Sequence, residues 1–237
     1  MLLTFLRSLQ QTKESLMKLR PSTVEQAIST LISLTMELSS LSKSSYSDNY
    51  DELAGMVANA HVKRVKQKIM VEQYLVEVVL RILYELWQRH YKRVFEPKTP
   101  QWVTDKFKKE KKTRIGAALY DTAKFAHLFL KVLIKHNRSA LKRIYELEVM
   151  GFLLDQITTP WDICYHEIFG AVNEDLNLPL DILEKAGIKS LADKLHSQIS
   201  RQNYSDKILE LLTYLCAPGG KPDRRIQDNV LEIILGF

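Results

Sequence analysis

Apolar residues recur along the chain every three or four positions, which is the period of an amphipathic α-helix. No run of residues alternates convincingly between polar and apolar, as a half-buried β-strand would. The pattern predicts a first helix over residues 2–19, a second one after Pro21, and a long helix from about Val62 to Tyr91. Further helices are predicted over about 138–150, 151–158, 162–172, 179–186, 188–200, 204–216 and 224–236.

The predicted helices are separated by recognisable breaks. Pro21 ends the first helix, and Ser22 with Glu25 three residues later forms a capping-box pattern that predicts the start of the second. A serine-rich polar linker follows over 42–49, and two prolines lie within residues 95–100. Residues 106–112 are predicted to form an exposed loop or a frayed helix start.

The segment from Ile115 to His136 has apolar residues nearly all the way round the predicted helix. Such a helix needs neighbours on several sides and is therefore predicted to be the buried centre of a stack. No motif repeats at a fixed tetratricopeptide or ankyrin period. The predicted fold is all-α, an irregular armadillo-like α-solenoid in which antiparallel helices follow one another through short connections.

Composition is that of an ordinary globular protein, with 46% hydrophobic and 26% charged residues. The two cysteines, Cys164 and Cys216, make no disulfide framework, which favours a reducing compartment. No uncharged apolar run approaches the roughly 18–20 residues that span a bilayer. These features predict a soluble chain that faces the cytosol.

The net charge of +6 is concentrated in one region. Residues 61–114 contain 15 Lys and Arg against 6 Asp and Glu, an excess of 9, so the remainder carries a net charge of −3. This basic band suggests an anionic partner such as a phosphate ligand, lipid headgroups, RNA or an acidic protein face. A solvated helix face followed by a mobile basic loop is the alternative interpretation. The candidates in the predicted loop are Lys106, Lys108, Lys109, Lys111, Lys112 and Arg114.

Catalytic and metal-binding patterns are weak. His166-Glu167 lacks the second histidine of a zinc-protease motif, and the six histidines have no metal-ligand spacing. His127 is predicted to be a hydrogen-bonded core residue. Gly219-Gly220-Lys221 is followed by Pro222 rather than Ser or Thr, so it predicts a helix stop rather than a phosphate loop. We expect no enzyme activity, no cofactor and no metal, and both cysteines are expected to pack in the core.

Three segments, in order, resemble the ryanodine/inositol trisphosphate receptor homology (RIH) domain of intracellular calcium-release channels. They are residues 66–73, residues 119–157, and the final part with Gly187 to Leu191 and Ile208 to Leu235. The resemblance covers about residues 60–237 and implies a helical armadillo unit. With it, residues 51–237 are expected to form the RIH-like domain, and residues 1–50 an N-terminal helical hairpin that packs on it.

The resemblance also implies where a ligand would bind. In the inositol trisphosphate receptor, basic residues on the opening helix and a Tyr-Arg-Lys triplet hold the phosphates. Arg64 and Lys68 match two of those positions, whereas Val71 replaces an arginine and Ser139, Ala140 and Leu141 replace the triplet. Three missing charge-assisted hydrogen bonds amount to roughly 4–9 kcal/mol, or about three to six orders of magnitude in affinity. Tight binding of inositol trisphosphate is therefore not expected.

The resemblance implies a cytosolic domain of a calcium-release channel, on the cytoplasmic side of the endoplasmic reticulum, which couples ligand or partner binding to gating. Its partners would be other domains or subunits of the channel. The alternative is a stand-alone armadillo-like scaffold in the cytoplasm that holds a partner protein. A third hypothesis is electrostatic binding of RNA or an anionic membrane through residues 106–114. The sparse aromatic residues near this segment argue against a nucleic-acid partner.

Overall fold

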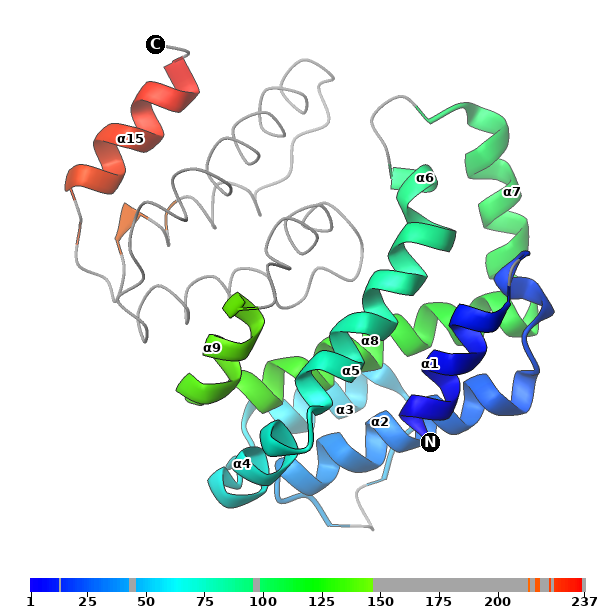
Figure 1. Ribbon diagram of the computed structural model, residues 1–237, viewed down its shortest axis with the longest axis horizontal. Helices are drawn as coiled ribbons and strands as arrows, with labels where there is room; N and C mark the ends of the chain where they lie inside the picture. The colour runs from blue at the N-terminus through cyan, green and yellow to red at the C-terminus, as the bar shows by residue number, and fades with distance from the viewer. Residues whose placement is uncertain are drawn as a thin grey trace. The chain divides into compact units, whose positions relative to one another are not determined.

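The computed structural model describes residues 1–12, 14–42, 46–95, 99–146 and 224–235, together with Thr213, Cys216, Ala217 and Pro222. Within these residues every regular element is a helix, so the predicted all-α class is confirmed (Figure 1). The helices predicted over 151–200, and nearly all of the one over 204–216, lie outside the described residues. The chain divides into two compact units, Met1–Asn137 and Arg138–Phe237, and each is described by itself.

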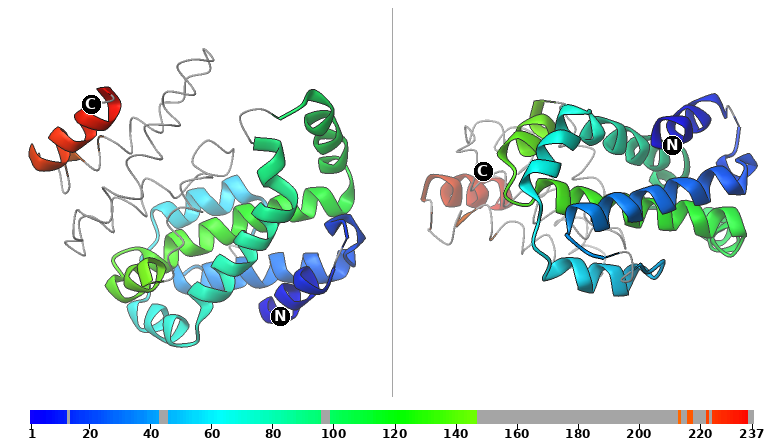
Figure 2. Two further views of the ribbon diagram at one scale, coloured as in Figure 1. Left: turned by 45° about the horizontal axis from the view of Figure 1, so that its top comes forward. Right: turned by 90° about the horizontal axis from the view of Figure 1, so that it is seen from below.

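The centre of the first unit is α8 (Arg114–Ile134), the apolar helix predicted over 115–136. It lies against α2 (Pro21–Leu38), α3 (Tyr50–Ala58), α5 (Leu75–Leu86) and α7 (Gln101–Lys111), as Figures 1 and 2 show. With neighbours on several sides, every residue from Phe125 to Leu130 is buried. The prediction of a buried central helix is therefore confirmed.

The helices α2 and α8 form the most extensive pairing in this unit, and they run in the same direction. At their first turns, Nη2 of Arg114 lies 2.7 Å from Oε1 of Glu25. At their last turns, α4 (Arg64–Glu72) contacts both helices through the hydrogen bonds described below. Parallel neighbours are expected where helix pairs are stacked in successive layers, whereas an up-and-down bundle makes neighbours antiparallel. This arrangement is that of an irregular armadillo-like stack.

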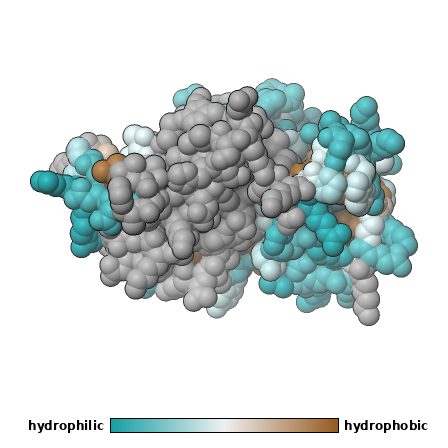
Figure 3. Space-filling model, turned by 90° about the horizontal axis from the view of Figure 1, so that it is seen from above, coloured by the Kyte–Doolittle hydropathy of each residue, from teal (hydrophilic) through white to brown (hydrophobic). Residues whose placement is uncertain are grey.

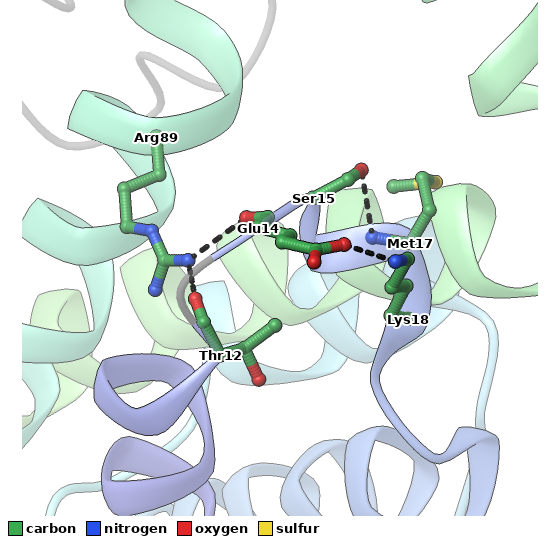
Figure 4. A network of polar contacts seen from close by, with 6 residues as sticks. All are labelled: Thr12, Glu14, Ser15, Met17, Lys18 and Arg89. Atoms are coloured by element: carbon green, nitrogen blue, oxygen red, sulfur yellow. Dashed lines mark hydrogen bonds and ion pairs between the residues drawn. The ribbon is translucent and has the colours of Figure 1, made fainter.

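The first predicted helix, over residues 2–19, is wrong beyond Gln11. Its first part is α1 (Leu2–Gln11), and after a turn the chain forms only one 3₁₀ turn, η1 (Leu16–Lys18). The cause is a distant side chain: the guanidinium of Arg89 donates hydrogen bonds to the backbone oxygens of Leu9, Thr12 and Glu14. Figure 4 shows the bonds to Thr12 and Glu14. These bonds occupy carbonyls that the amides of a continuing helix would otherwise bond. The chain therefore leaves the helix at this point.

The capping box predicted from Ser22 and Glu25 is also wrong. Pro21 is itself the first residue of α2, after Arg20, and no side chain caps this end. Proline suits the first helical position because its missing N–H would have no partner there. The helix therefore starts two residues too early for Ser22 to cap it, and Glu25 pairs with Arg114 instead.

The long helix predicted over 62–91 is divided into shorter pieces. Tyr74 has a left-handed backbone with φ of 59°, which separates α4 from α5. After α5 comes a π-helical turn, η3 (Trp87–Tyr91), and then the short α6 (Lys92–Phe95). The sequence pattern also missed α3, whose first turn is capped by the side-chain oxygen of Asn49, which accepts from the amides of Asp51 and Glu52.

In the second unit the structure describes α9 (Arg138–Glu146) and α15 (Arg224–Leu235). The predictions of helices over 138–150 and 224–236 are confirmed for these residues. Cys216 is half-buried, and burial raises the pKa of its thiol. A raised pKa keeps the thiol protonated at neutral pH, which makes it a poor nucleophile. Cys164 lies outside the described residues.

Candidate functional site

The helix α4, which carries the predicted phosphate-binding residues, is held in place by a buried glutamine. Gln67 is 2% exposed, and its Nε2 donates to the backbone oxygens of Val132 at 2.9 Å, Leu133 at 3.3 Å and Lys135 at 3.0 Å. These oxygens belong to the last turn of α8, where the helix has no further amides to bond its carbonyls. One side chain of α4 therefore caps the C-terminal end of the central helix.

Two further contacts attach α4 to the end of α2. The backbone amide of Lys63 donates to the carbonyl of Leu38 at 2.9 Å, and Nζ of Lys66 forms an ion pair with Glu37. Met70 and Val71 are buried beside Gln67. The inner face of α4 is thus fully used in packing, and its orientation on α2 and α8 is determined.

The predicted residues Arg64 and Lys68 lie together on the exposed face of α4, one helical turn apart. Nζ of Lys68 lies 3.9 Å from Oε1 of Glu72, one turn further on, which is a weak surface pair. The apolar side chains of Val65 and Ile69 lie on the same exposed side, 74% and 46% exposed. This α4 face (Arg64, Val65, Lys68, Ile69) combines two cations with an apolar pair.

The positions that lack the expected basic residues are also located. Val71, which replaces an arginine, is only 6% exposed, so its position faces the core rather than a ligand. On α9, in the second unit, Ser139 is exposed and Ala140 is buried. In the first unit the structure therefore places two of the predicted phosphate-binding residues, Arg64 and Lys68, on one surface.

The prediction of an exposed loop or a frayed helix start over residues 106–112 is wrong, because residues 106–111 form the second half of α7, which ends at Lys111. Lysines suit this place, since the C-terminal end of a helix carries a partial negative charge. No residue of α7 is buried. The helix is held mainly through the ring of Phe107, whose centroid lies 5.7 Å from that of His90 and 5.8 Å from that of Tyr91.

The six basic candidates of this segment separate into two groups. Lys111 lies over the ring of Tyr120, with Nζ 3.7 Å from the centroid, and Arg114 pairs with Glu25. Lys106 makes a loose pair with Glu110 at 3.8 Å. Lys108, Lys109 and Lys112 are exposed, and they take part in no ion pair with the described residues. Two of the six candidates therefore serve the fold, and four face solvent.

One buried histidine, His127, and one half-buried histidine, His90, are neutral at physiological pH. Nδ1 of His127 lies 2.7 Å from the carbonyl of Ala123, and burial lowers its pKa to about 4. This confirms the predicted hydrogen-bonded core histidine. Burial and, second, the charge of Lys106 lower the pKa of His90 to about 4. Among the described residues no group of His, Cys, Asp and Glu is arranged to hold a metal ion.

Two important residues, Gln67 and Arg89, were not identified from the sequence. Gln67 could have been found, because it shares helical spacing with Met70 and so lies on a buried face. Trp102 and Phe107 are the two aromatic residues near the lysines of α7, and the sequence did not indicate that Trp102 is 67% exposed. No sequence signal could have indicated Arg89, whose partners are about 80 residues away.

The structure thus defines an all-helical, layered domain with basic outer faces. The family model for the RIH domain matches residues 25–236, nearly the whole chain. The chain therefore belongs to the RIH-domain family, and it is a domain of the inositol trisphosphate and ryanodine receptor type. Comparison with curated proteins and with solved structures finds no match. None of the described helices is both long enough and apolar enough for a membrane span.

Proposed function

We propose that this chain works on the cytoplasmic side of the endoplasmic reticulum membrane, as a domain of a calcium-release channel. In this role it passes displacement from a region that binds a ligand or partner towards the channel gate. Its partners are the other domains or subunits of the channel. Membership of the RIH-domain family supports the channel context.

The attachment of α4 to two other helices is the observation that supports this role best. Through Gln67 it is bonded to the last turn of α8, and through Lys63 and Lys66 to the last turn of α2. Stacked helices contact mainly their neighbours, so a displacement of one is passed to the next. A partner that moves α4 therefore moves α2 and α8 with it.

Purification of the endogenous protein in mild detergent tests the channel context. We expect a membrane-spanning channel to be part of the same polypeptide or to be recovered with it. Calcium release from reticulum vesicles then tests the coupling: Gln67→Leu should change the response to the activating ligand, while Gln101→Leu, on exposed α7, should not. Recovery without any membrane-spanning protein would refute the channel context.

We further propose that this chain does not bind inositol trisphosphate tightly. Only Arg64 and Lys68 of the expected basic set are present, and both are exposed to water, where charge pairs are weak. Isothermal titration calorimetry should show no submicromolar affinity. The double variant R64Q/K68Q should behave like the unaltered protein in the same range, and a submicromolar dissociation constant that this variant abolishes would refute the proposal.

A stand-alone scaffold is the second candidate, and the α4 face favours it. Val65 and Ile69 are spaced by one turn, so they match the apolar anchors of an amphipathic helix, with Arg64 and Lys68 beside them to pair with acidic residues. The same purification distinguishes the two candidates. A single soluble partner, lost with Ile69→Asp, would support the scaffold.

A further inference from the structure

The outer face of α7 is the most basic exposed surface that the proposed function does not use. It carries Lys106, Lys108 and Lys109, with Lys112 directly after the last helical residue, and all four are exposed. One acidic residue, Asp105, shares this side, and Nε2 of Gln101 donates to it at 3.0 Å. A second acidic residue, Glu110, pairs with Lys106 at 3.8 Å, so the four lysine charges outnumber the acidic charges here by two.

Trp102 belongs to the same face. Trp102, Lys106 and Lys109 follow one another at helical spacing, so they form one ridge along α7. The indole is 67% exposed, although tryptophan is a residue that a folded protein usually covers. At the boundary between lipid and water an indole is stable, because its ring contacts the apolar region and its N–H bonds to water or headgroups.

The inner face of α7 determines which way this ridge points. Phe107 packs on the rings of His90 and Tyr91, and Lys111 lies over Tyr120. These contacts fix the rotation of the helix about its axis, so that the tryptophan and the four lysines are on the side away from the fold. Figure 3, which looks at the molecule from above the view of Figure 1, shows mainly hydrophilic residues among its coloured atoms.

We propose that the outer face of α7, formed by Trp102, Lys106, Lys108, Lys109 and Lys112, binds the surface of an anionic lipid bilayer. The helix lies along the headgroups, with its lysines near lipid phosphates and carboxylates and its indole at the level of the headgroups. Four lysines on one helix face are enough for electrostatic adsorption to anionic lipids. This inference does not depend on the channel function.

The shape of the face favours a bilayer over other anionic partners. A single exposed aromatic ring gives no platform on which successive bases of single-stranded RNA could stack. An acidic partner helix would need an apolar stripe at several turns, and Trp102 is the only exposed large apolar residue of α7. A lipid surface needs only a convex row of cations, which α7 supplies over its eleven residues.

Vesicle flotation tests the proposal directly. Vesicles of phosphatidylcholine with about 30% phosphatidylserine should bind the full chain, and vesicles of phosphatidylcholine alone should not. Raising the salt concentration about tenfold should remove most of the binding, because the attraction is screened. Each lysine near the surface is expected to contribute about fivefold, so K108Q/K109Q/K112Q should weaken the partition by roughly 100-fold.

The chain offers a matched control on the other basic helix. K63Q/R64Q/K68Q removes three exposed cations from the start of α4 and should change the partition by only a few-fold. Brominated lipids should quench part of the tryptophan emission, and Trp102→Ala should remove that part. Circular dichroism of each variant checks that the helices remain.

Three results would overturn the proposal. The first is equal loss of binding in the α4 and α7 triple variants, which would indicate a general charge effect. The second is equal binding to neutral and anionic vesicles. The third is preference for a single-stranded RNA oligonucleotide over anionic vesicles in direct competition, which would identify α7 as an RNA-binding face instead.

Discussion

The helices α4 and α7 are both short, basic and exposed on one side, yet the fold holds them in different ways. A buried glutamine, two buried apolar residues and a backbone hydrogen bond attach α4 to α8 and α2. In contrast, α7 has no buried residue and is held through Phe107 and Lys111 at its partly covered side. Charge composition does not distinguish these helices, whereas their packing does.

This difference indicates two kinds of role. A helix bonded to the ends of two others suits the proposed coupling role, because it cannot move without them. A helix with no core residue can shift at small energetic cost, and such regions commonly open first. We therefore assign coupling to α4 and surface binding to α7, and the predictions below test that assignment.

Lowering the pH should cause the largest loss of stability, because buried His127 and half-buried His90 resist protonation in the folded state. The pKa of His90 and of His127 is about 4 in the folded state, against about 6.5 when unfolded. Above pH 6.5 both states are neutral and stability is complete. As the pH falls from about 6.5 to 4 only the unfolded state takes up protons, so each histidine reduces the free energy of unfolding by about 3 kcal/mol.

Urea unfolding at pH 7, 5 and 4 measures this loss, and His90→Phe should remove about half of it. Hydrogen exchange then separates the two helices. His90 lies beneath α7, with Tyr91, Phe107 and the charge of Lys106 around it, so α7 amides should exchange before those of α8. Simultaneous exchange of both helices would contradict the weak attachment of α7.

Replacing the buried glutamine of α4 should give the next largest effect. Gln67→Leu removes a donor from three carbonyl oxygens at the end of α8. That of Leu133 keeps a bond from Nδ2 of Asn137 at 3.2 Å, whereas those of Val132 and Lys135 lose the bond from Gln67, and buried acceptors without a partner are costly. We expect the free energy of unfolding to fall by about 3 kcal/mol. Chemical denaturation at pH 7 measures this.

Gln101→Leu is the matched control on α7. Its Nε2 donates only to Asp105 on the same exposed helix, so the change should be within about 0.5 kcal/mol. Equal effects of the two glutamine variants would show that α4 is no better anchored than α7.

The parts of the fold that could be predicted from the sequence are those determined by local pattern. The apolar circumference of residues 115–136 predicts α8 because burial on all sides requires apolar residues on all sides. The end of α1 at Gln11 and the break between α4 and α5 at Tyr74 could not be predicted in this way. The first depends on hydrogen bonds from Arg89, which is distant in the sequence. The second depends on the left-handed backbone of Tyr74, a conformation that a sequence usually signals with glycine rather than tyrosine.

The basic candidate residues also show the difference between features that depend on local sequence pattern and features that depend on distant residues. Their exposure and helical spacing could be predicted once a helix was assumed, but their partners could not. Arg114 bonds to Glu25, 89 positions earlier in the sequence, and the ammonium of Lys111 lies over the ring of Tyr120 on the next helix. Pairings between elements depend on how the helices are placed, which a single helix pattern does not contain.

A substitution at the junction between α7 and α8 should give the smallest loss of stability among these predictions. It tests how closely the two helices approach each other. A Cβ on Gly116 would lie 2.0 Å from the backbone oxygen of Glu110, so Gly116→Ala forces the end of α7 away. A Cβ on Gly55 of α3 would meet nothing within 4 Å. We expect Gly116→Ala to destabilise by about 2 kcal/mol, and Gly55→Ala to stabilise by about 0.5–1 kcal/mol, since alanine favours helix.

Thermal unfolding of both alanine variants measures whether each one is destabilised or stabilised. Hydrogen exchange shows which helices lose protection. Because α7 has no buried residue, it can move to relieve the clash, so in Gly116→Ala its amides should exchange faster while those of α4 keep their protection. The variant should also bind anionic vesicles with altered strength, since the ridge of lysines is displaced. Stabilisation by alanine at both positions would mean that α7 does not approach α8 closely, and its outer face would then have no fixed direction.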